Sequence, residues 1–573
     1  MEKREIIFLS IVMIVVFLGQ LYIADRVLFG DDYIFAELAE NNKFFFTENA
    51  HPPLPVWSDI LITEIFPLTN RTMRLTSIIF ATLTIPLVYL LAKKTIGEKA
   101  AWIAALLAGF SAWHIRASQM NSGSDGGMFT FFFYLTLYFF LKYLETKQTK
   151  NKIGAGIMFG LTILSKETGV LLIPVCGLYY CYTFWKRKKE ATENIFMKES
   201  IINGIKNSAV ICLIALVIWS IFPILDIIYN NNQSTDAIVS RINEVVIERE
   251  STIDYNYWFM TVFSIFKLLL WTGPLLLFLP LVSVMTKKEW KQEGIFILLI
   301  LVSVLFYFII IPPNLDRTRY LMILIPALAI LSAKYIGEKT EEWNKKEWLL
   351  VGVCSVMIFI SFLWINQNNS IVSYESQQNP LVLVKQANIN FSIPVFTETD
   401  NSGFLLHFSI FAVAYGISAI AGFALFTRQN KTVGKIALIM LLSISIGYNF
   451  VVAEDYGLHW TSPNYSDGIK ELILYAQRAP LQEPLYLLKN YELQWYLRDN
   501  YSLFVSDYGI SETDETKIAA FAAELDEHGG TVIFTDMPPM DKNGLLWQTI
   551  NEECVKEFSY LDKDVEIAWV WGC

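Results

Sequence analysis

Residues 6–23 read IIFLSIVMIVVFLGQLYI, a nearly uninterrupted apolar run near the start of the chain. A helix needs about 20 apolar residues to cross the hydrocarbon core of a membrane. Similar runs recur near residues 75–92, 101–113, 128–144, 153–164, 168–185, 208–228, 268–285, 295–311, 319–335, 348–365, 407–427 and 435–453. We therefore expect an all-α polytopic membrane domain of about 13 transmembrane helices. Residues 255–267 are expected to form an interfacial helix leading into the eighth span, because Lys267 is costly at the bilayer centre.

The composition agrees with a membrane protein, and the acidic charge is confined to one end. Hydrophobic residues make up 54% of the 573 and charged residues only 17%. The formal net charge is -10, but residues 455–573 hold 8 Lys and Arg against 21 Asp and Glu, so the remainder is slightly basic. Nucleic-acid binding needs a concentrated basic face. The charge distribution therefore argues against a nucleic-acid partner.

Lys and Arg concentrate in alternate loops, and this asymmetry predicts the orientation. The basic loops lie near residues 93–99, 142–152, 186–189, 287–291, 345–346 and 428–435. Such loops face the cytoplasm by the positive-inside rule. The N-terminus is then cytoplasmic, in the plasma (cell) membrane. An odd number of spans places residues 455–573 outside, so we expect a transmembrane domain (1–454), with outward catalytic loops (24–73 and 114–127), and an extracytoplasmic domain (455–573).

The C-terminal region has the pattern of a small α/β domain. Strands are expected at 485–488, 503–505 and 532–534, and helices at 465–477, 515–528 and 545–553. The region has no GxGxxG motif and no P-loop, so no nucleotide is expected. Cys554 and Cys573 are interpreted as two free thiols, with a disulfide as the alternative if the domain faces an oxidising compartment. Trp569 and Trp571 are expected to pack against the membrane face or the domain core.

The chemistry-bearing residues begin directly after the first span, where Asp31 and Asp32 are adjacent. A carboxylate at the membrane surface can act as a base that takes a proton from an acceptor hydroxyl. A solvated turn, or N-capping of a helix by Asp32, is the alternative. The two residues alone do not decide between these interpretations.

Further motifs follow in order along the first 190 residues. They are His51-Pro52-Pro53-Leu54, Arg74-Leu75-Thr76-Ser77, Thr84-Ile85-Pro86-Leu87-Val88-Tyr89-Leu90, Ser111-Ala112-Trp113-His114-Ile115-Arg116-Ala117-Ser118-Gln119 and Ser124-Asp125-Gly126. In this order and spacing the chain resembles family 39 glycosyltransferases and their relatives, the protein O-mannosyltransferases and the lipid A aminoarabinose transferases. These enzymes belong to the GT-C class. The resemblance is weaker beyond residue 190.

The resemblance implies roles for individual residues. It implies that Asp31 or Asp32 is the catalytic base, although the family often has Asp-Glu here, which leaves open which carboxylate acts. It implies that His51 faces the donor phosphate or the acceptor. It also makes Asp125 a catalytic candidate, although the preceding Met-Asn-Ser-Gly departs from the family pattern. The substrate-binding candidates within the other motifs are Arg74, His114 and Arg116.

Cations near the outer surface are candidates for binding a phosphate, because a phosphate leaving group gains charge in the transition state. Lys166-Glu167 lies between two short spans and resembles a Thr-Lys-x-x-Gly motif of the family, which implies contact with the donor. The alternative is that Lys166 anchors the turn at the membrane interface. Arg317 and Arg319 oppose the positive-inside trend and resemble, with Tyr320, the family's Arg-Tyr entry to a late span. Bidentate hydrogen bonding to a phosphate would account for arginines at this position. Snorkelling of their side chains toward lipid headgroups is the alternative.

The sequence therefore predicts a membrane glycosyltransferase that moves a sugar from a polyprenyl-phosphate donor to a protein, lipid or glycan acceptor on the outer face. The resemblance implies an Asp general base and a single displacement, and a single displacement inverts the configuration at the sugar carbon. No cofactor is expected; a divalent metal stays open, although two adjacent carboxylates alone make a poor site. One alternative is a polytopic lipid or glycan transporter or flippase-associated protein without transferase activity. Another is a non-catalytic scaffold. The absence of internal sequence repeats disfavours a transporter.

Overall fold

The computed structural model describes most of the chain. Its described residues are 2–573 except 27, 29–30, 46–51, 120–125, 191–195, 232, 247–254, 287–291, 308–319, 369–391, 398–399, 428–429, 459–464, 489–492, 499, 503, 507–514, 536–543 and 563–564. The chain forms two compact units. The first contains 1–24, 34–358 and 414–449, and the second contains 25–33, 359–413 and 450–573.

Each of the thirteen expected spans contains a helix. They are α1 (Lys3–Ile23), α4 (Asn70–Ile96), α5 (Glu98–Gly109), α7 (Gly127–Thr146), α8 (Thr149–Ser165), α9 (Leu172–Glu190), α10 (Phe196–Asn230), α12 (Tyr255–Met285), α13 (Gly294–Leu305), α15 (Ile325–Lys339), α16 (Lys345–Asn368), α19 (Phe408–Thr427) and α20 (Lys431–Gly457). Among the described residues, nine helices are long and apolar enough to cross a membrane by length and composition. The helices α5, α8, α13 and α15 are shorter, at 12 to 17 residues. The prediction of an all-α polytopic membrane domain is confirmed.

Large apolar side chains project outward from several of these helices. On α1, Ile11 and Leu18 are 56% and 57% exposed, while Leu9 and Val16 on the same helix are buried. In water this exposed face would be unfavourable, whereas in lipid it costs nothing. The exposed apolar faces therefore fit a bilayer as the solvent of this unit.

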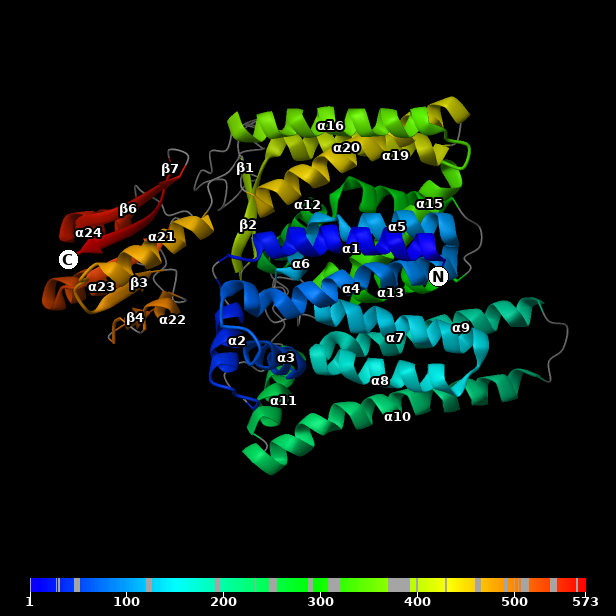
Figure 1. The fold of residues 1–573 in the computed structure, drawn as a ribbon, viewed down its shortest axis with the longest axis horizontal. Coiled ribbons are helices and arrows are strands. Elements are labelled where there is room, and N and C mark those ends of the chain that lie inside the picture. The colour runs from blue at the N-terminus through cyan, green and yellow to red at the C-terminus, as the bar shows by residue number, and fades with distance from the viewer. Residues whose placement is uncertain are drawn as a thin grey trace. The chain divides into compact units, whose positions relative to one another are not determined.

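The helices of the first unit pack side by side (Figure 1). α8 contacts α7 on one side and α10 on another, and α4 contacts α5 and α7. A Cβ at Gly160 would lie 2.5 Å from Cβ of Ile218, and one at Gly127 would lie 2.2 Å from the Ser77 carbonyl oxygen. Small residues of this kind let helix backbones approach closely inside a membrane. The glycines therefore fix the spacing of α8 to α10 and of α7 to α4.

The helix α12 is broken at Gly273, whose φ of 73° is left-handed, and Pro274 follows it. Proline cannot donate the N–H that would satisfy a carbonyl one turn back. The hydroxyl of Tyr448 on α20 donates to the Leu270 carbonyl at 2.9 Å, and Tyr415 on α19 donates to the Leu269 carbonyl. Two phenols thus satisfy carbonyls beside the break, where hydrocarbon offers no donor. The helix runs unbroken from Tyr255 up to this point, so the described backbone shows no separate interfacial helix over 255–267.

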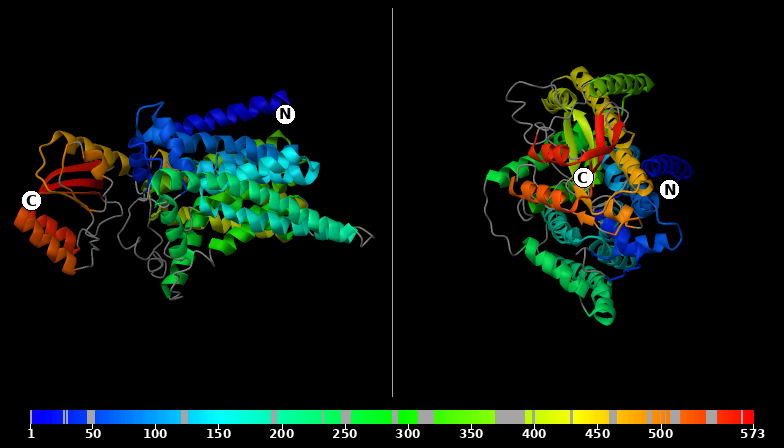
Figure 2. Two further views of the ribbon diagram at one scale, coloured as in Figure 1. Left: turned by 90° about the horizontal axis from the view of Figure 1, so that it is seen from below. Right: turned by 90° about the vertical axis from the view of Figure 1, so that its left-hand side faces the viewer.

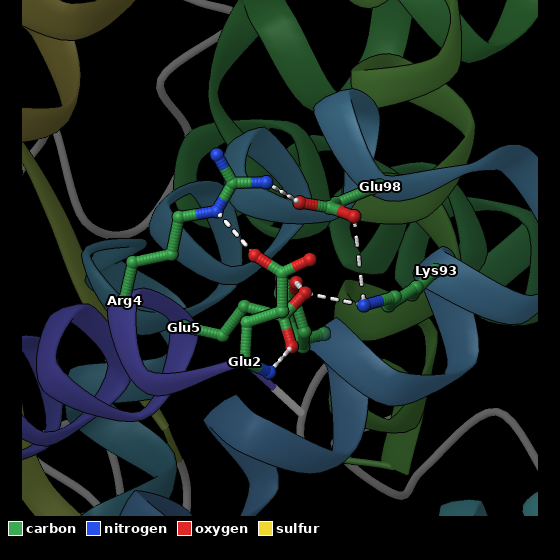
Figure 3. Close-up of polar contacts among 6 residues, drawn as sticks. Glu2, Arg4, Glu5, Lys93 and Glu98 are labelled. Carbon is green, nitrogen blue, oxygen red and sulfur yellow. Dashed lines mark hydrogen bonds and ion pairs between the residues drawn. The ribbon is translucent and has the colours of Figure 1, made fainter.

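Ion pairs join helix ends at the side of the first unit where the basic turns lie. Lys93 on α4 pairs with Glu5 on α1 and lies 3.6 Å from Glu98, which also accepts from Arg4 at 3.2 Å (Figure 3). The Tyr89 hydroxyl donates to Glu5 at 2.7 Å. Further pairs join α4 to α7, α13 to α15 and α16 to α20, namely Lys94–Glu145, Lys334–Glu293 and Lys435–Glu347. Lys93, Lys94 and Lys435, which belong to the basic loops that predicted the orientation, therefore also hold helix ends together.

Shorter elements occupy the connections. They are α2 (Asp31–Glu40), α3 (Leu54–Thr63), α6 (Ala112–Ser118), η1 (Glu167–Leu171), α11 (Gln233–Val246), η3 (Leu321–Leu324) and the antiparallel strands β1 (Ser392–Thr397) and β2 (Asp400–His407). The helix α11 is held at its start by Asp226, whose carboxylate accepts from the Thr235 N–H at 2.6 Å. Carboxylates at helix N-termini stabilise the free N–H groups there.

The second unit contains a five-stranded sheet of order β4-β3-β5-β7-β6. Its strands are β3 (Leu485–Leu488), β4 (Phe504–Ser506), β5 (Thr531–Thr535), β6 (Val555–Asp562) and β7 (Val565–Gly572), with β3, β4 and β5 parallel and β6 and β7 antiparallel to their neighbours. The helices are α21 (Tyr465–Arg478), α22 (Leu493–Leu497), α23 (Glu515–His528) and α24 (Leu545–Glu553). The three expected strands and three expected helices are confirmed. The hairpin β6–β7 and the short α22 were not predicted.

The sheet lies between α21 and α22 on one face and α23 and α24 on the other (Figure 2). Leu485 and Leu487 of β3 point to the α21 side, whereas Tyr486 points to the α23 side, as the alternation of a strand requires. Trp569 and Trp571 belong to the α23 side and are buried. Of the two expected places for these tryptophans, the domain core is the one observed.

Cys554 and Cys573 form a disulfide, which corrects the expectation of two free thiols. Cys554 directly precedes β6 and Cys573 directly follows β7. The hairpin pairs Val555 with Gly572, so antiparallel register brings the two flanking cysteines together, with Cα atoms 4.1 Å apart. The expectation failed because the hairpin itself was not recognised in the sequence.

Candidate functional site

Lys166 lies in a sharp turn between α8 and η1. Its backbone is extended, with φ at -157°, and its N–H still bonds to the Thr162 carbonyl at 2.9 Å. The Gly169 N–H donates to the Lys166 carbonyl at 3.0 Å, which closes the turn. A Cβ at Gly169 would lie 2.9 Å from Cγ2 of Thr162. Glycine at this position therefore allows the turn to fold tightly back on α8.

The turn places the Lys166 side chain in the interior, where it is 0% exposed. Its Nζ lies 5.3 Å from the ring centroid of Tyr320 and 3.7 Å from a Glu167 carboxylate oxygen. Tyr320 in turn stacks on Tyr307, with centroids 5.6 Å apart and planes 3° from parallel. A buried ammonium group needs such partners, because burial of a charge is costly. The structure therefore brings the adjacent residues Lys166 and Glu167 together with Tyr320, which is distant from them in the sequence.

The helix α6 carries the second group of expected residues. Ser111 caps it, since its hydroxyl accepts from the His114 N–H at 3.0 Å. The His114 side chain is 6% exposed. Burial lowers the pKa of His114 to about 4, and a hydrogen bond with the Ala81 backbone offsets this only in part. His114 is therefore neutral at pH 7, which suits hydrogen bonding better than charge pairing with a phosphate.

Arg116 on the same helix is completely buried. Its guanidinium carbon lies 5.2 Å from the ring centroid of Trp271 on α12. Guanidinium groups stack on indole rings favourably, and more strongly where water is excluded. The Trp271 contact explains how α12 and α6 are joined near the break in α12.

Arg74 connects three helix ends. Its Nε donates to the Gln119 carbonyl at 2.7 Å, and its Nη1 donates to the Ala24 carbonyl at 3.1 Å. The Gln119 side chain donates to the Gln20 carbonyl at 3.0 Å. Arg74 thus satisfies carbonyls after α1 and α6 that have no partner within their helices. These contacts describe a structural role, and substrate binding by Arg74 stays a prediction.

Both groups are linked to the segment around η3. α6 contacts α4, α7, α12 and η3, and η3 begins directly after Tyr320. The Tyr134 hydroxyl on α7 donates to the Ile323 carbonyl of η3 at 2.6 Å and accepts from the Ala327 N–H at 3.1 Å. Tyr134 therefore holds the segment that carries Tyr320. The segments around residues 74 and 114–116 are neighbours, and Lys166 lies beside Tyr320, the residue before η3, which α6 also contacts.

Several expected residues lie outside the described part of the chain. His51, Asp125, Arg317 and Arg319 are among them. Asp31 and Asp32 are the first two residues of α2, but their side chains are not described. Asp32 therefore lies inside the first turn of α2, where a negative charge favours the helix dipole.

The structure also reveals buried polar residues that sequence reasoning missed. Asp59 on α3 is 1% exposed, and Tyr307 is 1% exposed beside Tyr320. A carboxylate within the apolar helix Leu54–Thr63 was the signal for Asp59. Tyr307 lies in an apolar run without any such signal. Among the described residues, no group of three or more His, Cys, Asp or Glu side chains could hold a metal ion.

Comparison with known proteins gives a family match over part of the chain and a similar fold over all of it. Residues 50–219 match the family model for dolichyl-phosphate-mannose-protein mannosyltransferase. The fold resembles that of ArnT from Cupriavidus metallidurans bound to undecaprenyl phosphate, with a TM-score of 0.58, 14% identity and coverage of 100% of this chain and 98% of that one. The structure of the same protein in the apo state gives a TM-score of 0.57 and 14% identity, with coverage of 99% of this chain and 97% of that one. A comparison with curated proteins by sequence finds no match.

Together, the family match over residues 50–219 and the similar fold over the whole chain indicate a multi-pass membrane glycosyltransferase. More particularly, the chain is similar to ArnT along its whole length and to the protein mannosyltransferases over residues 50–219. The expectations of a GT-C-like membrane fold and of a glycosyltransferase are confirmed.

Proposed function

We propose that the protein transfers a sugar from a polyprenyl-phosphate donor to a hydroxyl group of a protein, lipid or glycan acceptor on the outer face of the membrane. The observation that carries this proposal is the buried Lys166 ammonium group beside Tyr320. An ammonium group held away from water binds a phosphate strongly, because the surroundings screen it little. The ArnT structure with a similar fold contains undecaprenyl phosphate, which supports a lipid phosphate as the ligand.

The reaction is a single displacement. The acceptor hydroxyl oxygen attacks the anomeric carbon, a new carbon–oxygen bond forms, and the bond to the phosphate oxygen breaks with its electron pair. The proton passes to the carboxylate of Asp31 or Asp32, and the configuration at the anomeric carbon inverts. Lys166, with Arg317 and Arg319, stabilises the charge that develops on the departing lipid phosphate. Asp125, His51, Arg74, His114, Arg116 and Glu167 remain candidates for acting on or orienting the substrates.

The outer location rests on two independent features. The Cys554–Cys573 disulfide belongs to an oxidising compartment, since thiols stay reduced in the cytosol. The basic turns of the first unit, including Lys93 and Lys94, follow the positive-inside rule if their end of the helices is cytoplasmic. Both features favour a cytoplasmic N-terminus and an extracytoplasmic domain at 455–573.

The test uses the full-length protein in liposomes, with a radiolabelled polyprenyl-phosphate sugar and membrane extract as acceptor. Asp31→Asn and Asp32→Asn remove a base without changing size. We expect one of them to lower transfer by about 100-fold or more, the range typical of a general base. Asp236→Asn on α11 is the matched control, because that carboxylate is exposed and has no assigned role.

Full transfer by both Asn variants would remove Asp31 and Asp32 as the base. Movement of the labelled lipid between leaflets without any sugar transfer by the wild type would instead favour the transporter alternative. Neither result is expected from a chain with the fold of a glycosyltransferase.

A further inference from the structure

The segment that follows α1 is held by residues from the far end of the chain. The Leu28 N–H donates to the Tyr496 hydroxyl at 2.8 Å, and Leu28 is 0% exposed. Tyr496 belongs to α22 of the C-terminal α/β domain. An N–H buried in this way needs its partner, because an unsatisfied buried donor is costly. Leu28 and Tyr496 belong to the same compact unit.

Two neighbours of Leu28 make further contacts of this kind. The Asp25 carboxylate lies 3.3 Å from the Lys470 ammonium group of α21. The Arg26 guanidinium lies 4.2 Å from the ring centroid of Tyr456, at the end of α20, and Arg26 is only 7% exposed. Asp25, Arg26 and Leu28 are therefore held by α21, α20 and α22, respectively.

The anchor at Tyr496 is itself fixed to the core of the domain. Leu493 and Leu497, on either side of it in α22, are buried in the hydrophobic cluster beneath α21. The Gln477 side chain of α21 also donates to the Tyr496 carbonyl at 3.1 Å. The position of the hydroxyl therefore follows the position of the sheet domain.

The anchored segment leads directly to the proposed base. Asp31 is three residues after Leu28, so its Cα lies within about 11 Å of the Leu28 Cα, since a chain spans at most about 3.6 Å per residue. We expect a movement of the anchor to shift the start of α2. Catalysis is sensitive to such movement, because misplacement of a reacting group by about 1 Å costs roughly 100-fold in rate.

We propose that the C-terminal α/β domain positions the catalytic base, and that Tyr496, Lys470 and Tyr456 are positioning residues that act through residues 25–28. This inference rests on the proposed function, because it requires Asp31 or Asp32 to be the base. It assigns the domain a part in the chemical step rather than in docking alone.

The decisive variants are Tyr496→Phe and Tyr501→Phe. Both remove a phenol hydroxyl from a half-buried side chain of the same domain. The Tyr501 hydroxyl bonds only within the domain among its described partners, to the Ala476 and Ala479 carbonyls at 2.6 Å and to the Leu481 N–H at 3.4 Å. Tyr501→Phe therefore tests domain stability alone, whereas Tyr496→Phe also releases Leu28.

Two readouts are taken on the full-length protein in liposomes. The first is amide hydrogen exchange of the peptide that covers residues 25–33, and the second is kcat and KM for the labelled polyprenyl-phosphate sugar. We expect Tyr496→Phe to speed exchange in this peptide and to lower kcat by about 5-fold, the effect of one lost hydrogen bond, with the KM for the donor unchanged. Tyr501→Phe is expected to leave both unchanged.

A second pair of variants checks the ion pair. Lys470→Met removes the partner of Asp25, and Lys556→Met removes an ion pair at 3.0 Å with Glu566 that lies within the β6–β7 hairpin. We expect a lower kcat only in Lys470→Met. The effect is expected to be small, about 2-fold, because exposed ion pairs contribute little.

Faster exchange at residues 25–33 with normal kcat in Tyr496→Phe would overturn the positioning role and leave the proposed function intact. Equal loss of kcat in Tyr496→Phe and Tyr501→Phe would overturn it too, because domain stability would then explain both. Absence of transfer by the wild type would overturn the proposed function, and the positioning role with it.

Discussion

The ammonium group of Lys166 lies 5.3 Å from the ring centroid of Tyr320, although more than 150 residues separate the two in the sequence. One comes from the turn after α8 and the other from the residue before η3. Their meeting gives the first unit a buried cation with an aromatic face beside it. The charge and the ring have separable effects, so each can be tested alone.

Lys166→Met is expected to lower sugar transfer by about 100-fold, because removal of one group that stabilises a developing negative charge has effects of this size. Tyr320→Phe keeps the ring and is expected to leave transfer nearly normal. Tyr320→Leu removes the ring and is expected to raise the KM for the donor about 3-fold, the value of an ordinary cation–aromatic contact. Initial rates at varied donor concentration measure all three. A Tyr320→Phe variant as inactive as Lys166→Met would show that the hydroxyl, rather than the ring, is required.

Gly127→Ala is expected to destabilise the packing of α7 on α4. The new Cβ would lie 2.2 Å from the Ser77 carbonyl oxygen and 2.7 Å from the Ala81 backbone nitrogen, and backbone atoms cannot move aside easily. Overpacking of this kind costs about 1–3 kcal/mol. The melting temperature of the purified protein in detergent measures the effect.

Gly177→Ala is the matched control for Gly127→Ala, because nothing lies within 4 Å of a Cβ at Gly177. Glycine is also less favourable than alanine in a helix by about 1 kcal/mol. We therefore expect Gly177→Ala to be neutral or stabilising. A Gly127→Ala protein that melts no lower than the wild type would contradict the close approach of α4 and α7.

The β6–β7 hairpin is expected to weaken in acid. Burial raises the pKa of Glu566, but hydrogen bonds from Lys556, Ser559 and Trp569 outweigh it and hold that pKa below its usual value. The ionised carboxylate therefore stabilises the folded hairpin above pH 4.5, and this stability is lost as the pH falls through the lowered pKa. Amide exchange of residues 555–572 between pH 3 and pH 6 measures it. In Glu566→Gln, the hairpin should exchange faster at pH 6, and its stability should depend less on pH.

The sequence predicted elements whose determinants are local. Each of the thirteen apolar runs contains a helix, since in a membrane each helix satisfies its own backbone hydrogen bonds. In the C-terminal domain, β3 and α23 were found because alternation and helical periodicity are visible within one segment. The hairpin β6–β7 was missed because the run from Val555 to Cys573 mixes charged and apolar residues without a clear turn signal. The disulfide was missed with it.

The candidate site was predictable in its residue types but not in its contacts. Lys166 was singled out because its sequence resembles the Thr-Lys-x-x-Gly motif of the family. Its contact with Tyr320, however, depends on how α8 and η3 are packed. The contact of Leu28 with Tyr496 joins segments 468 residues apart, and no local pattern indicates it. Such contacts follow from the folded arrangement of many elements together.

The break in α12 has a consequence for how this sequence can diverge. Pro274 leaves the Leu270 carbonyl without its usual helical donor, and Tyr448 supplies that donor from α20. In a relative with an ordinary residue at position 274 and a regular helical backbone at position 273, the 274 N–H would bond to the Leu270 carbonyl, and phenylalanine at position 448 would then carry no penalty. The two positions should therefore be exchanged as a linked pair during evolution, and replacement of either one alone should be selected against.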